Sequence, residues 1–127
     1  MPMDNVQLAE SLFAAFAAND GDAARELCNP DLKAFQNARE AMTLDTLLQF
    51  SSAVSGVVQN FRYEDNVCSA TESGFVEEHT VRGTLADGSE LLLRACVVGE
   101  VSNGKVDVLR EYVDSAAASG LVRALAS

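Results

Sequence analysis

Residues 75–114 read FVEEHTVRGTLADGSELLLRACVVGEVSNGKVDVLREYVD. The pairs Asp87-Gly88 and Asn103-Gly104 consist of residues that accept positive φ, so each pair marks a tight turn between antiparallel strands. The flanking runs are β-rich and about ten residues long, whereas most strands have five or six residues. Long antiparallel strands twist and curl, and helices can cover the concave face of a curled sheet. The stretch therefore predicts a β-meander beside a pocket.

The composition indicates one acidic domain. The 127 residues are 48% apolar, which suits a single domain over residues 1–127 with one core. Nineteen acidic residues against nine Lys and Arg give a net charge of −10. Such a surface repels phosphate backbones and anionic lipid, so we expect neither nucleic-acid nor membrane binding. The chain has no apolar run of ~20 residues and no signal-peptide pattern, so we expect it in the cytoplasm.

The cysteines and the one histidine argue against a bound metal. Cys28, Cys68 and Cys96 are odd in number and far apart, and no Cys-x-x-Cys pair occurs. With His79 as the only imidazole, a zinc site is not expected. We expect buried, reduced thiols, no metal and no cofactor.

The remaining sequence predicts helices around the meander. Asp4 and Gln7 form a capping box before apolar residues at helical spacing, and a short second helix follows. Asp31 to Asn37 has the pattern of a short strand, and Thr43 caps a third helix. A last, Ala-rich helix spans 116–125. This order predicts an α+β domain.

The turn at Asp87-Gly88 determines which side chains share a face. A two-residue turn pairs polar residues of one strand with apolar residues of the next: Arg82 with Leu93, Thr80 with Ala95, and Glu78 with Val97. His79 then follows the opposite face. In the alternative arrangement, Glu78, Thr80 and Arg82 point to solvent while Phe75, His79 and Val81 point inward. The residue pattern alone favours this alternative, since antiparallel strands usually alternate polar-out.

The second turn determines the face of Glu111. A three-residue loop, Ser102 to Gly104, puts Glu111 opposite Ala95 on the apolar face. A two-residue turn at Asn103-Gly104 shifts the pairing by one residue and sends Glu111 to the other side. The residues themselves leave both arrangements open.

The order of the predicted elements and three segments of the sequence carry a family resemblance. The segments are Gly-Thr-Leu-Ala-Asp-Gly-Ser-Glu at 83–90, Asn-Gly-Lys-Val at 103–106 and Leu-Arg-Glu-Tyr-Val-Asp at 109–114. In these features the chain resembles the nuclear transport factor 2-like superfamily. The chain is most similar to its SnoaL-like branch, which includes ketosteroid isomerases, polyketide cyclases and limonene epoxide hydrolases. The resemblance implies a cone: a strongly bent sheet around a hydrophobic pocket, closed by three helices, with a short C-terminal helix. It also implies a homodimer through the outer sheet face.

The catalytic residues of the characterised members are largely not matched. The isomerase tyrosine, base and acid fall on Leu12, Asn37 and Val97. The epoxide-hydrolase Arg-x-Asp falls on Glu78 and Thr80, and the second aspartate falls on Glu111. The resemblance thus implies that Glu111 stands where a catalytic carboxylate would be, and it favours the arrangement with Glu78, Thr80 and Arg82 inside the pocket.

These observations define a candidate site and two candidate functions. The catalytic candidates are Glu111 as base, with Glu78 and Thr80 beside it. The expected pocket lining and ligand contacts are Leu12, Phe16, Phe35, Asn37, Arg82, Leu93, Ala95, Val97, Leu109 and Val113. One function is a small acid–base enzyme, of isomerase, cyclase, hydratase or hydrolase type, acting on a hydrophobic, oxygen-bearing metabolite. The other is a non-catalytic ligand-binding or dimerisation module.

The outward residues of the last two strands support the expected homodimer. They are too apolar for the solvent face of a monomer: Leu92, Arg94, Cys96, Val98, Val106, Val108 and Tyr112.

Overall fold

The computed structural model describes residues 3–126. Its elements, in chain order, are α1 (Asn5–Ala17), α2 (Gly21–Leu27), β1 (Cys28–Gln36), α3 (Leu44–Val57), β2 (Val58–Ala70), β3 (Gly74–Leu85), β4 (Glu90–Ser102), β5 (Lys105–Val113) and α4 (Ser119–Ala126). The predicted α+β class is confirmed. Within the described range, no helix is long and apolar enough to cross a membrane.

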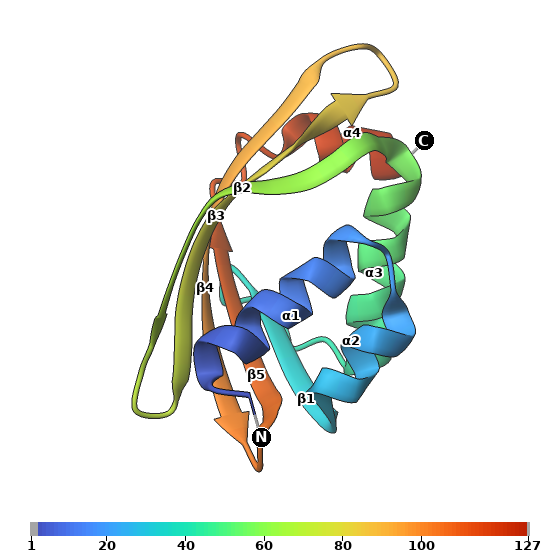
Figure 1. The fold of residues 1–127 in the computed structure, drawn as a ribbon. Helices are drawn as coiled ribbons and strands as arrows, with labels where there is room; N and C mark the ends of the chain where they lie inside the picture. The colour runs from blue at the N-terminus through green and yellow to red at the C-terminus, as the bar shows by residue number, and fades with distance from the viewer. Residues whose placement is uncertain (1–2, 127) are drawn as a thin grey trace.

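The five strands form one mixed sheet in the order β1-β5-β4-β3-β2. Strands β2 to β5 pair antiparallel as a meander, and β1 joins the edge of β5 in parallel. The sheet curls without closing, and helices α1, α2 and α3 lie on its concave side (Figure 1). The result is the predicted cone, with β1 and β2 as its two edges.

Short polar side chains begin the helices where the sequence predicts them. The Asp4 carboxylate accepts from the Gln7 backbone N–H at 2.8 Å, and the Asp4 N–H donates to the Gln7 side chain at 3.1 Å. The Thr43 hydroxyl accepts from the Thr46 N–H at 3.2 Å at the start of α3. Each contact satisfies backbone donors that have no partner inside the helix. The last helix starts later than predicted, at Ser119 rather than at residue 116.

The predicted register of the β3–β4 hairpin is wrong by one residue. Gly88 has φ +86°, and the Leu85 N–H donates to Ser89 O, so the loop holds three residues rather than two. The observed pairs are Glu78 with Cys96, Thr80 with Arg94 and Arg82 with Leu92. Because a one-residue slip moves every side chain to the other face, Glu78, Thr80 and Arg82 lie on the outer face of the sheet.

In the second hairpin a bulge cancels the effect of a shorter turn. Ser102 pairs with Lys105, so the turn at Asn103-Gly104 has two residues, both with positive φ. The register then shifts between Glu100 and Val101, which places one extra residue, Asp107, in β5. The extra residue restores the phase, and Glu111 pairs with Val97 on the inner face. The same bulge leaves Val106 fully buried, so the prediction that Val106 lies on the outer face is wrong.

Two clusters of buried apolar side chains fill the cone. One joins α1, α2 and β1 to the sheet and includes Leu12, Phe13 and Phe16. The other joins α3 and α4 to β3 and β4 and includes Val54, Leu93 and Leu121. Tyr63 of β2 packs against both clusters. The space between the two clusters holds the cavity described next.

Candidate functional site

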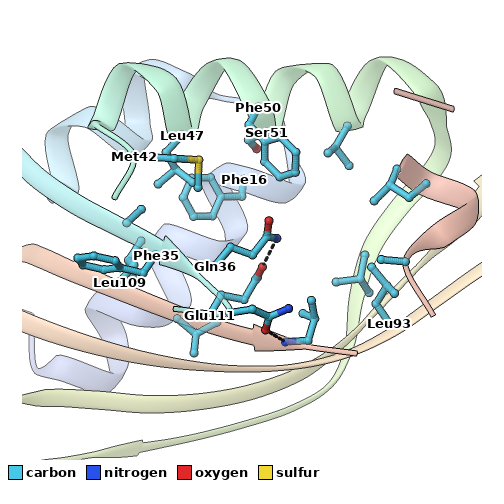
Figure 2. Close-up of a pocket in the computed structure, with 18 of the residues that line it drawn as sticks. Phe16, Phe35, Gln36, Met42, Leu47, Phe50, Ser51, Leu93, Leu109 and Glu111 are labelled. Carbon is cyan, nitrogen blue, oxygen red and sulfur yellow. Dashed lines mark hydrogen bonds between the residues drawn. The ribbon is translucent and has the colours of Figure 1, made fainter. Parts of the chain in front are cut away.

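A cavity of about 380 Å³ lies between the helices and the concave face of the sheet. Most of its wall is apolar, with Phe16 from α1, Leu47 and Phe50 from α3, and Leu93 and Leu109 from the sheet (Figure 2). Leu121, Val122 and Leu125 of α4 complete the wall. This volume fits a drug-sized molecule rather than a single water. The cavity therefore has the size and lining of a small-molecule site.

Glu111 and Gln36 place a hydrogen-bonded polar pair inside this apolar space. Strands β1 and β5 put the two residues side by side, since Gln36 and Glu111 are register partners. The Gln36 Nε2 donates to Glu111 Oε1 at 2.9 Å, and both side chains point from the sheet toward α3 (Figure 2). The amide thus fixes the orientation of the carboxylate in the cavity.

Tyr63 adds a phenol to the same cavity. Its ring packs edge-on to Phe13 and to Phe61, with centroids 5.5 and 5.2 Å apart. Burial raises the pKa of the Tyr63 hydroxyl above its ordinary value, and the negative charges of Glu111 and Glu77 raise it further. The phenol therefore stays protonated at neutral pH and can donate a hydrogen bond.

Asn37 lines the cavity, but both ends of its side-chain amide are hydrogen-bonded within the protein. Oδ1 accepts from the Val113 N–H at 2.9 Å, and Nδ2 donates to Ser115 Oγ at 3.1 Å. The backbone is left-handed here, with φ +51°, and the Asn37 N–H donates to Glu111 O at 2.8 Å. These contacts join the end of β1 to the end of β5, next to Glu111.

The other expected lining residues divide into two groups. Those that lie on the cavity wall are Phe16, Phe35, Leu93, Val97, Leu109 and Val113. Leu12 and Ala95 are buried in the surrounding core and do not line the cavity.

Three expected site residues lie outside the cavity because of the hairpin register. Thr80 is buried on the outer face, between its register partners Glu64 and Arg94. An Arg82 nitrogen lies 3.8 Å from a Glu64 carboxylate oxygen on the same face. Glu78 is exposed there. None of the three can act on a molecule bound inside the cone.

Sequence reasoning missed Gln36 and Tyr63. The parallel pairing of β1 with β5 brings Gln36 to Glu111, and no local pattern in the sequence signals that pairing. Tyr63 follows a register shift in β2 between Gln59 and Arg62. Because of this shift, simple alternation along β2 does not predict on which face of the sheet Tyr63 lies. Residues 3–126 contain no cluster of three or more His, Cys, Asp or Glu side chains suited to hold a metal ion.

The chain is similar to solved structures throughout its length. An LEH-like epoxide hydrolase from M. tuberculosis is 19% identical; the match covers 96% of this chain and 92% of that one, with a TM-score of 0.75. A nuclear transport factor 2-like protein from Burkholderia xenovorans LB400 is 20% identical, with 98% of each chain covered and a TM-score of 0.76. The BvnE pinacolase from Penicillium brevicompactum is 14% identical, with 95% and 93% covered and a TM-score of 0.78.

No protein-family model and no curated protein sequence matches the chain. At 14–20% identity, the structural likeness establishes the fold and leaves the reaction open. The chain has the cone fold of these structures, which is the fold that its resemblance to the nuclear transport factor 2-like superfamily implies.

Proposed function

We propose that this chain is a cofactor-independent acid–base enzyme that acts on a small, hydrophobic, oxygen-bearing metabolite. The observation that carries the proposal is a carboxylate, Glu111, held by Gln36 inside a largely apolar cavity of about 380 Å³. The same fold hosts an epoxide hydrolase and a pinacolase among its solved structures, which supports this class of chemistry.

Three polar side chains of the cavity wall, Gln36, Tyr63 and Glu111, have a role in this proposal. Gln36 occupies Glu111 Oε1, so Oε2 is the oxygen that takes a proton from the substrate. The Tyr63 phenol donates a hydrogen bond to the substrate oxygen on which negative charge develops. Glu111 then returns the proton to another atom of the same molecule or to the leaving oxygen. A surrounding apolar wall excludes water and strengthens both interactions.

A substrate-independent probe tests the base directly. 5-Nitrobenzisoxazole loses its C3 proton to a carboxylate while its N–O bond breaks, and the coloured cyanophenolate that forms reports the rate. We expect the wild-type chain to accelerate this elimination about 10²-fold over Glu111→Gln, the lower end of what a positioned base contributes. Glu72→Gln makes the same chemical change at an exposed position and should leave the rate unchanged.

Ligand binding is measured separately from the reaction. Thermal shifts with terpenoid, steroid and aromatic lactone compounds report occupation of the cavity in both the wild-type chain and Glu111→Gln. Equal elimination rates for the two proteins, together with ligand-induced stabilisation, would remove Glu111 as the base and leave a ligand-binding module.

A further inference from the structure

Glu77 and His79 form a buried polar pair that the proposed function does not use. The Glu77 Oε1 and His79 Nδ1 atoms are 2.5 Å apart, and the two side chains are 3% and 1% exposed. The observed β3–β4 register places both residues on the inner face of β3, where Glu77 pairs with Val97 and His79 with Ala95. Burying a carboxylate in an apolar core is costly unless a hydrogen-bonded partner compensates it, and the His79 imidazole is that partner here.

The pair presents one free ring nitrogen. A carboxylate can only accept, so the contact requires the hydrogen on Nδ1 and leaves Nε2 as the outer end of the imidazole. In the described part of the chain, Nε2 is buried and has no hydrogen-bond partner. An imidazole held at one nitrogen by a carboxylate, with the other nitrogen free, is the arrangement of a positioned general base.

Only one layer of side chains separates this imidazole from the cavity. The Tyr63 and Phe13 rings contact the imidazole, with centroids 4.4 and 5.1 Å from it, and both rings also line the cavity. Val97, the register partner of Glu77, also lines the cavity. So does Val81, the next inward residue after His79. The Phe13 and Tyr63 rings therefore stand between the imidazole and the space that holds Glu111.

We propose that Glu77 and His79 form a second acid–base site directly behind the cavity wall, where Nε2 receives a hydroxyl group of the bound compound once the Phe13 ring turns aside. The hydroxyl proton passes to Nε2, the O–H electron pair stays on the ligand oxygen, and the Glu77 carboxylate balances the imidazolium. This inference rests on the proposed function only in that the same cavity holds the ligand.

The position of the pair also defines the ligand more closely. Glu77 and Glu111 both pair with Val97, from opposite sides, so their Cα atoms lie two strand spacings apart, roughly 10 Å. A compound that meets both groups carries oxygen functions at opposite ends of a skeleton about two fused rings long. The cavity thus fits a two-ring compound with two oxygen functions.

Access to Nε2 can be measured because His79 is the only histidine in the chain. Diethyl pyrocarbonate carbethoxylates a neutral imidazole nitrogen, with loss of carbon dioxide and ethanol, and the absorbance at about 240 nm then reports His79 alone. We expect Phe13→Ala to react about tenfold faster than Leu12→Ala, since local opening controls the reactivity of a buried group. Leu12 is an equally buried neighbour on α1 that lies outside the cavity wall, so it controls for lost stability.

A ligand pair tests the hydroxyl contact. With ¹⁵N-labelled histidine, 2,6-naphthalenediol should shift the Nε2 resonance, whereas naphthalene, which fills the same space without oxygen, should not. The shift should persist in Glu111→Gln, because the two sites are separate groups.

The outcomes distinguish this inference from the proposed function. Equal carbethoxylation rates for Phe13→Ala and Leu12→Ala, or a diol that binds without moving the Nε2 resonance, would overturn the second site. A diol that fails to bind at all counts against the cavity as a ligand site, and the carbethoxylation rates then decide whether Nε2 opens to it. Loss of the elimination activity alone would concern Glu111 and not His79.

Discussion

Asn37 is a structural residue of the site rather than a free ligand-binding group. Its side chain bonds the Val113 N–H and the Ser115 hydroxyl, and its backbone has a φ of +51°. We expect Asn37→Ala to lower the free energy of unfolding by about 2 kcal/mol or more, because the replacement removes the partner of a partly buried N–H and puts alanine in a left-handed conformation. Urea denaturation measures the change.

Two further substitutions at Asn37 separate the effect of backbone strain from the effect of the lost hydrogen bonds. Asn37→Gly keeps the left-handed backbone free of strain and loses only the hydrogen bonds, so it should cost less than alanine. Asn37→Asp keeps an acceptor for the Val113 N–H and should cost least of the three. Unchanged stability in Asn37→Ala would return Asn37 to the ligand-binding role that its position in the sequence suggests.

Cys28 gives the chain a specific sensitivity to high pH. Burial raises the pKa of the Cys28 thiol from its ordinary 9.0 to about 11, and the charge of Lys105 opposes the rise only partly. Between these two values the unfolded chain releases a proton that the folded chain retains, so stability falls as pH rises through this window. From about pH 8 to about pH 10.5, the wild-type chain should lose about 2 kcal/mol more than Cys28→Ala.

Urea denaturation of both proteins at the two pH values, with reductant present, measures this difference. Tyr63 also titrates at high pH, but it is present in both proteins, so its contribution cancels. Cys96→Ala serves as a graded control: the Cys96 thiol is only partly buried, and its pKa is raised less. Parallel pH profiles for the wild-type chain and Cys28→Ala would show that the thiol is solvated.

At the scale of elements, the turns decide what the sequence can and cannot reveal. The capping residues Asp4 and Thr43 predict their helices correctly, because a cap acts within one helical turn. The pair Asp87-Gly88 predicts a hairpin, but the same residues suit loops of two or three residues, and this single difference reverses the face of Glu78 and His79. Local signals fix the elements, while register depends on packing across the sheet.

Local signals also leave the register around Glu111 undetermined. A three-residue loop predicts the inward position of Glu111, whereas the chain has a two-residue turn and a bulge at Asp107. The residue pattern does not mark that bulge, because Lys105 to Val108 alternate between polar and apolar residues as in a regular strand. Only the family resemblance predicts the face of Glu111. The position of Gln36 beside Glu111 follows from the pairing of β1 with β5, which the sequence does not predict.

The pairing of β3 with β4 leads to a prediction at Gly99, the register partner of Phe75. A Cβ atom at Gly99 would lie 2.2 Å from Cζ of Phe75, a ring with no exposed surface. Gly99→Ala should therefore lower the free energy of unfolding by about 1–3 kcal/mol, as overpacking of a core usually does. Thermal or urea denaturation measures the loss.

Gly56 provides the matched control on α3. A Cβ there meets nothing within 4 Å, and alanine favours the helix more than glycine does. Gly56→Ala should leave stability unchanged or raise it by up to about 1 kcal/mol. A stable Gly99→Ala protein would mean that the Phe75 ring can move, and the cone wall near Glu77 would then be softer than its packing indicates.

At the scale of the whole molecule, the cone joins two apolar clusters that leave a cavity where they meet. Each cluster closes on its own part of the sheet, and the polar groups Gln36, Tyr63 and Glu111 lie at the junction. Residues of both clusters line the cavity, so the cavity depends on the whole fold and on no single element. This explains why sequence reasoning predicts that a pocket exists more readily than it predicts which residues line it.

The outer face of the sheet gives the last prediction. Leu92 and Tyr112 are each 45% exposed on this face, and Cys96, the register partner of Tyr112, is partly exposed beside Tyr112. Extended apolar patches mark interfaces, and large exposed apolar side chains on both β4 and β5 favour one here, so we propose a homodimer formed by two copies of this face. The net charge of −10 on each copy opposes association, and added salt should therefore strengthen the dimer.

Light scattering coupled to size exclusion measures the assembly. We expect a dimer at micromolar concentration for the wild-type chain and a monomer for the double variant Leu92→Glu and Tyr112→Glu, since two added carboxylates per copy would face their counterparts across the interface. Ala14→Glu adds charge on the exposed side of α1, away from the sheet, and should remain dimeric. A monomeric wild-type chain at high salt would contradict the proposal and leave this apolar face without a second copy to cover it.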